Sequence, residues 1–241
     1  MTAIRATHDI SLAKATLIYI LATAYFFFLL LTFLPFVKNQ FSFNPALDWF
    51  ITGYLLFIPL FCYAVAKARQ EGNRSFRQTL QSLNIKPFSR RDWKYAIVGL
   101  SLTFALTGVA FGVSSLLTRQ FGIRPLTTTP WFMEIHPFQG RETLLLLVWL
   151  PMFFFNIVGE EILWRGYIQD RLQIKPAWPV CALLWMVFHA PFGLDLMVML
   201  IPVIVIIPYI FHQTNNTTIG IFIHGLYNGP TFVAVALGLL H

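Results

Sequence analysis

The sequence predicts an all-α membrane protein, a bundle of about seven transmembrane helices with a range of six to eight. Of its 241 residues, 57% are hydrophobic and only 11% are charged. So few polar side chains cannot cover the surface of a soluble globule of this size, whereas about 20 consecutive apolar residues make one helical crossing. We find no linker or internal repeat, and therefore expect residues 1–241 to form a single integral membrane domain.

The expected spans are the stretches that contain no Asp, Glu, Lys or Arg. They cover residues 15–37, 49–66, 95–118, 143–159, 176–194 and 196–240. The last stretch is too long for one crossing, and its polar run at 212–218 divides it into 196–211 and 219–240. Interruptions by Pro and Gly leave room for one crossing more or fewer. The longest external loop is expected at 119–142.

The basic residues predict how the chain is oriented. The loop at 67–94 holds eight Lys and Arg, and Lys and Arg are enriched in cytoplasmic loops. With this loop inside, the amino terminus and the 165–175 turn are also cytoplasmic, and 13 of the 17 basic residues lie inside. We therefore expect a multi-pass protein in the plasma membrane of a prokaryote, with its amino terminus in the cytoplasm.

The net charge of +7 fits this topology and contact with anionic lipid in the bilayer. Nucleic acid is not an expected partner, because the basic loop carries no DNA- or RNA-binding motif. Cys62 and Cys181 both lie in apolar stretches and form no zinc-binding pattern, so we expect them to behave as small hydrophobic residues.

The candidate site lies in the second half of the chain, where polar residues interrupt three consecutive spans. Two adjacent carboxylates end the apolar run 144–159, and an acidic residue at membrane depth indicates a functional site because its insertion is costly. Three ordered motifs follow: Glu160-Glu161-x-x-x-Arg165, Trp185-x-x-x-His189 and His224-x-x-x-Asn228.

The spacing assigns different roles to these residues. Glu161 and Arg165 are four residues apart on a helix and are expected to form an ion pair. Glu160 points about 100° away from Glu161 and is the carboxylate that is free to face a substrate. Counted from the cytoplasmic turns, Glu160 and His189 lie level at roughly 15–20 Å depth, and the His224 motif at roughly 10–15 Å. We therefore expect a cavity that opens to the cytoplasm.

Several functions are compatible with such a cluster. A carboxylate and an imidazole can deprotonate a water, while a second imidazole and an amide can donate to an oxyanion. Two His and one Glu can also hold a catalytic metal. A proton-coupled transporter using Glu160 and a non-catalytic scaffold or immunity protein are the alternatives, although recognisable inverted repeats are lacking. The chain has no His-Glu-x-x-His, no Gly-x-Gly-Asp and no Gly-x-Ser in a rhomboid context, which disfavours other intramembrane peptidases.

Over about residues 143–232, the three motifs together resemble the CAAX-protease and bacteriocin-processing (CPBP, or Abi) family, which includes the type II CAAX prenyl endopeptidases. The resemblance implies an intramembrane endopeptidase whose catalytic core is this segment and whose substrate is a membrane-associated or lipid-modified peptide or protein. It further implies that Glu160 and His189 activate the water, that His224 and Asn228 stabilise the oxyanion, and that Glu161 and Arg165 are supporting residues. Two options stay open: no cofactor, or a divalent metal such as zinc held by Glu160, His189 and His224.

Overall fold

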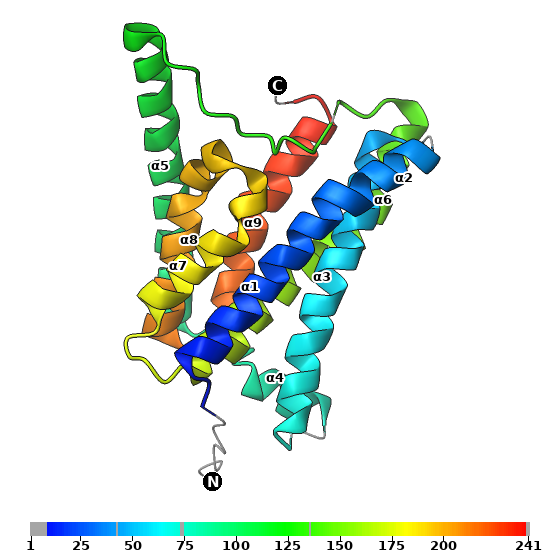
Figure 1. Ribbon diagram of the computed structural model, residues 1–241. Coiled ribbons are helices and arrows are strands. Elements are labelled where there is room, and N and C mark those ends of the chain that lie inside the picture. Colours follow the sequence, from blue (N-terminus) through cyan, green and yellow to red (C-terminus); the bar gives the residue numbers. More distant parts are fainter. Residues whose placement is uncertain (1–8, 42, 73–74, 135, 240–241) are drawn as a thin grey trace.

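The computed structural model describes residues 9–41, 43–72, 75–134 and 136–239, and within these ranges the chain is helical and has no strand. Figure 1 shows the helices packed as a tilted bundle. In chain order they are α1 (Leu12–Phe28), η1 (Leu29–Phe33), α2 (Leu34–Gln40), α3 (Pro45–Gln70), α4 (Phe76–Ser82), α5 (Arg90–Phe121), η2 (Gly140–Leu144), α6 (Leu145–Glu161), η3 (Ile162–Gln169), α7 (Trp178–Phe188), η4 (Ala190–Phe192), α8 (Leu194–Thr214) and α9 (Thr217–Ala236).

Six continuous helical stretches of the described chain are long and apolar enough to cross a membrane: Leu12–Gln40, Pro45–Gln70, Arg90–Phe121, Gly140–Gln169, Leu194–Thr214 and Thr217–Ala236. This confirms the all-α polytopic fold, at the lower end of the predicted range. The expectation that 176–194 is a further crossing is wrong. Its helix α7 has only 11 residues. That corresponds to about 16 Å, roughly half the hydrocarbon thickness of a bilayer.

Local sequence explains where the helices begin and end. The side chain of Asn44 accepts from the backbone N–H of Ala46 and caps α3, while Ser89 and Asp92 form a reciprocal capping box at the start of α5. Gly193 has a φ of 91°, which allows the chain to reverse between η4 and α8. This reversal leaves His189 at the inner end of a short helix.

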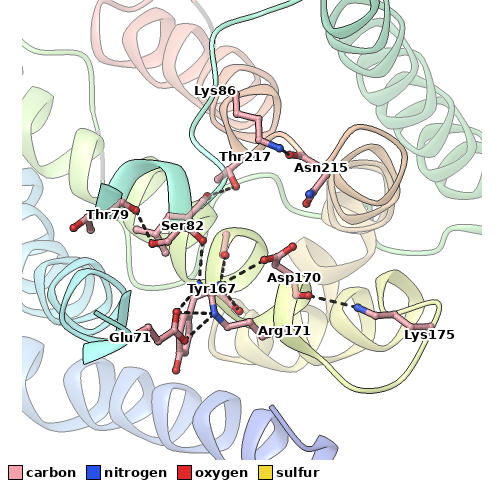
Figure 2. A network of polar contacts seen from close by, with 12 residues as sticks. Glu71, Thr79, Ser82, Lys86, Tyr167, Asp170, Arg171, Lys175, Asn215 and Thr217 are labelled. Carbon is pink, nitrogen blue, oxygen red and sulfur yellow. Dashed lines mark hydrogen bonds and ion pairs between the residues drawn. The ribbon is translucent and has the colours of Figure 1, made fainter. Parts of the chain in front are cut away.

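One end of the bundle, called the turn end here, consists of α4, the 170–177 turn and the turn between α8 and α9 at 215–216. Arg171 binds Glu71 of the α3–α4 connection through Nε–Oε1 at 2.9 Å and Nη2–Oε2 at 2.7 Å (Figure 2). Its Nη1 also donates to the carbonyl of Gly166 at 2.8 Å. Thr217 at the start of α9 donates to the carbonyl of Leu83 at 2.7 Å. Direct bonds therefore hold α3, α4, η3 and α9 together at this end.

The opposite end, called the loop end, is covered by the segment at 122–139 (Figure 1). The described residues of this segment contain no helix. Phe132 is buried against Phe26 and Trp49, and the Trp131 indole donates to the carbonyl of Pro191 at 2.8 Å. The segment therefore enters the bundle rather than only resting on its surface.

Candidate active site

Glu160 is buried near the end of α6 and receives two hydrogen bonds. The indole Nε1 of Trp185 on α7 donates to its Oε2 at 2.7 Å. The amide of Asn156, one turn earlier on α6, donates to its Oε1 at 3.2 Å. Each donor engages a different carboxylate oxygen, so the orientation of the carboxylate is fixed while lone pairs remain for a group in the cavity.

Glu161 is fully buried behind Glu160 and has two partners of its own. The Arg165 Nε lies 3.4 Å from its Oε2, so the pair predicted from the four-residue spacing is present. His224 Nδ1 on α9 lies 3.0 Å from its Oε1. Arg165 lies in η3, a π-helix, and such helices are rare and frequently occur at functional sites. Glu161 therefore joins η3 to the helix that carries the third motif.

The approach of Glu161 to α9 depends on a glycine. A Cβ at Gly220 would collide with Glu161 Oε2, so only glycine leaves room for the carboxylate at this position. Gly225 on the same helix has no such role, because a Cβ there would make an ordinary contact with Ile157 Cγ2 at 3.8 Å.

His189 follows the last residue of α7, and its backbone partner determines its tautomer. Its Nδ1 lies 2.8 Å from the carbonyl oxygen of Trp185. A carbonyl oxygen can only accept, so Nδ1 carries the proton, and Nε2 of the neutral ring is free to act as an acceptor or base. The ring stacks on Phe192 with 5.4 Å between centroids. The resulting tautomer suits a general base.

Trp185 connects the other site residues, a role that the spacing of the three motifs does not indicate. Besides bonding Glu160, its ring lies 3.6 Å from the Arg165 guanidinium carbon and 5.5 Å from the His224 ring. The signal that could have revealed this role is the indole N–H, because a buried Trp usually finds a hydrogen-bond partner.

The site contains a cavity of about 410 Å³, and its lining includes Glu160, His189, His224 and Asn228. These four residues come from α6, the end of α7 and α9, so the structure brings together the set predicted from the motifs. Glu161 and Arg165 do not line the cavity and lie behind it. Asn156, Thr107 of α5 and Tyr227 of α9 are further polar lining residues.

The cavity extends toward the loop end. Its lining includes Thr128, Thr129 and Pro130 of the 122–139 segment, together with Trp49 and Val235 from the neighbouring helix ends. No described lining residue belongs to the 165–175 or 212–218 turns, and the cytoplasmic opening of the cavity stays a prediction. The depth of a residue along its helix does not by itself reveal where side chains leave space.

The side chains as placed do not fit a metal centre. Among the described residues, no three His, Cys, Asp or Glu side chains lie close enough together to hold an ion. The alternative in which Glu160, His189 and His224 share a metal therefore has no support in this geometry.

Comparison with known families identifies the segment that holds this site. Residues 142–229 match the family model described as type II CAAX prenyl endopeptidase Rce1-like. The match contains all three motifs and confirms the resemblance that they indicate. Searches among curated proteins and among solved structures found no match.

Proposed function

From the similarity of residues 142–229 to the Rce1-like CAAX endopeptidases, and from the cavity, we propose that this chain is an intramembrane peptidase. Its substrate is a membrane-associated or lipid-modified peptide or protein. The observation that carries the proposal is that a carboxylate, two imidazoles and an amide from three separate helical segments line one cavity.

In the proposed reaction, Glu160 and His189 position a water and remove its proton as its oxygen attacks the carbonyl carbon of the scissile peptide bond. His224 and Asn228 donate hydrogen bonds to the oxyanion that forms. The carbon–nitrogen bond then breaks, and the proton taken from water passes to the leaving amine. The products are a carboxylate and an amine.

The pairing of His224 with Glu161 supports its role as a donor. A neutral imidazole that donates from Nδ1 to a carboxylate has no proton left on Nε2. To donate to an oxyanion from Nε2 as well, His224 has to be an imidazolium, which the adjacent carboxylate stabilises. Glu161 is thus proposed to orient His224 and balance its charge, while Arg165 holds Glu161.

The test is cleavage of a reporter peptide library in detergent by purified protein. Glu160→Gln and His189→Ala are each expected to lower turnover by about 10²–10⁴-fold, the usual contribution of a general base. Glu134→Gln is the matched control, because Glu134 is exposed at 68% of its side-chain surface. Thermal unfolding measurements check that each variant is folded.

A variant that keeps more than about a tenth of wild-type turnover would remove that residue from the catalytic role. A chelator is expected to leave turnover unchanged, since the proposed steps use protein side chains only. Loss of activity on chelation, with recovery on adding zinc, would contradict this mechanism. A wild-type protein that cleaves nothing in the library would favour the scaffold alternative.

For the cellular setting, we propose the plasma membrane of a prokaryote with the amino terminus in the cytoplasm, from the distribution of Lys and Arg. We also propose one membrane domain over 1–241, with its catalytic core at about 143–232.

A further inference from the structure

We infer that Arg171 and Glu71, neither of which lines the cavity, are positioning residues for the proposed reaction. Together they fix the π-helix η3, and through η3 they fix how Glu161 on α6 meets His224 on α9. The inference rests on the proposed function for the reaction itself. It adds a role for the amino-terminal half of the chain, because Glu71 lies outside the segment 142–229 that matches the family.

The first support is that Arg171 caps the carboxyl end of η3. The last carbonyl groups of a helix have no partner within that helix. Nη1 of Arg171 donates to two of these carbonyls, that of Gly166 at 2.8 Å and that of Tyr167 at 3.3 Å. A cation at this position also complements the negative end of the helix dipole. Arg171 therefore fixes the last turn of η3.

The second support is that the other donors of Arg171 tie this cap to α3 and α4. Nε donates to Glu71 Oε1 at 2.9 Å, and Nη2 donates to Glu71 Oε2 at 2.7 Å and to the carbonyl of Ser82 at 3.1 Å (Figure 2). Together with the two bonds of Nη1, these bonds use all five N–H groups of the guanidinium. The side chains of Arg171 and Glu71 are only 5% and 8% exposed, so solvent screens this two-pronged pair weakly.

The third support is that η3 lies directly against the start of α9. A Cβ at Gly166 would collide with the carbonyl oxygen of Leu83, to which Thr217 Oγ1 donates at 2.7 Å. Thr217 is the first residue of α9, and His224 follows about two turns later on the same helix. His224 Nδ1 in turn lies 3.0 Å from Glu161 Oε1. A displacement of η3 is therefore transmitted to the helix that carries His224.

The fourth support is the contrast between the two arginines. Arg165 is fully buried, and among the described residues its Nη1 and Nη2 have no hydrogen-bond partner. Its guanidinium lies 3.4 Å from the Glu161 carboxylate and 3.6 Å from the centre of the Trp185 ring. Such contacts depend less on direction than hydrogen bonds do, so the backbone of η3 determines where Arg165 lies. Because Arg171 caps that backbone, it determines how Arg165 meets Glu161.

The test compares conservative variants in steady-state reporter cleavage. Arg171→Lys keeps the charge, but one ammonium group cannot replace the planar fork that binds Glu71 and the η3 carbonyls together. It should lower kcat by about 10- to 100-fold with KM changed by less than about threefold, because a misplacement of about 1 Å can cost about 10²-fold. Glu71→Gln should lower kcat by about 3- to 10-fold, since an amide has only one accepting oxygen for the two donors of Arg171.

Two controls separate positioning from general destabilisation. Arg124→Lys makes the same substitution in the exposed ion pair with Asp195 and should leave kcat within about threefold of wild type. Leu30→Ala removes a buried side chain of η1 and should lower the unfolding temperature without a comparable loss of kcat. If Leu30→Ala and Arg171→Lys lost stability and kcat to the same extent, the inference would be overturned.

The double variant Glu71→Arg, Arg171→Glu separates the ion pair from the cap. It retains opposite charges on α3 and on the 170–177 turn, but a carboxylate at position 171 cannot donate to the carbonyls of Gly166 and Tyr167. Its kcat should therefore stay at least about tenfold below wild type. Recovery of wild-type kcat would show that the ion pair alone is sufficient and would refute the capping role. If the double variant does not fold, Arg171→Lys and its controls decide the question.

Hydrogen–deuterium exchange tests the same coupling without using activity. In Arg171→Lys, the backbone amides of η3 (162–169) and of the start of α9 (217–224) should exchange at least about tenfold faster than in wild type, whereas Arg124→Lys should leave them unchanged. Equal protection of η3 in Arg171→Lys and wild type would overturn the inference whether or not the reporter is cleaved. Faster exchange with unchanged kcat would refute the positioning role. A wild-type protein that cleaves no reporter counts against the peptidase proposal alone.

Discussion

Replacement of Trp185 by Phe tests how Glu160 is held in position. The substitution keeps an aromatic ring beneath Arg165 but removes the N–H that donates to Glu160 Oε2 at 2.7 Å. A hydrogen bond to a charged group contributes about 1.5–3 kcal/mol. If that whole amount is lost in the transition state, turnover falls by about 10- to 160-fold.

Trp164→Phe is the matched control for this substitution. Trp164 and Trp185 are both completely buried. Among the described residues, the indole Nε1 of Trp164 has no hydrogen-bond partner, and its ring stacks on Tyr19 with 4.1 Å between centroids. Both substitutions therefore remove the same volume and one indole N–H, but only Trp185→Phe removes a bond to the site.

The assay is steady-state cleavage of a reporter peptide in detergent, with thermal unfolding measured in parallel. Trp185→Phe should lower kcat with little change in KM, because the hydrogen bond that is lost orients the catalytic carboxylate of Glu160. Trp164→Phe should keep kcat within about threefold of wild type. Installing 3-benzothienylalanine at position 185, which keeps the ring shape and lacks the N–H, should reproduce the loss seen with Phe. Equal loss of kcat in both Phe variants would show that ring volume, rather than the hydrogen bond, is what matters.

Two further predictions concern the residues behind the cavity. Arg165→Ala should lower the free energy of unfolding by about 3–5 kcal/mol in thermal or denaturant unfolding, because it removes the guanidinium beside the buried carboxylate of Glu161. Adding Glu161→Gln should restore part of that loss. The control substitution Lys38→Ala, at a surface ion pair, should cost at most about 1 kcal/mol. An Arg165→Ala protein as stable as wild type would contradict the structural role of Arg165. Gly220→Ala should lower both stability and turnover, because its methyl group displaces Glu161 and with it His224. The control Gly225→Ala should be neutral or slightly stabilising, since Ala is favoured over Gly in helices by roughly 0.8–1.0 kcal/mol. Equal unfolding temperatures for the two glycine variants would refute the close approach on which this prediction rests.

The sequence by itself determined the features that depend on composition and on neighbours along one helix. The apolar stretches located six spans, because burial in a bilayer requires a long run of apolar residues whatever their partners are. The four-residue spacing was sufficient for the Glu161–Arg165 pair, since residues one turn apart share a helix face. The stretch at 176–194 was misjudged as a full crossing because its apolar composition does not reveal the reversal after His189.

Tertiary packing decided the contacts between helices and the direction of the cavity. Trp185 and Glu160 are 25 residues apart, and His224 and Glu161 are 63 residues apart, so no helical periodicity relates either pair. The cavity is lined by side chains of α3, α5, α6, α8 and α9, which lie far apart in the sequence. These features follow from side-chain volumes and from the relative tilt of the helices, and local sequence patterns reveal neither.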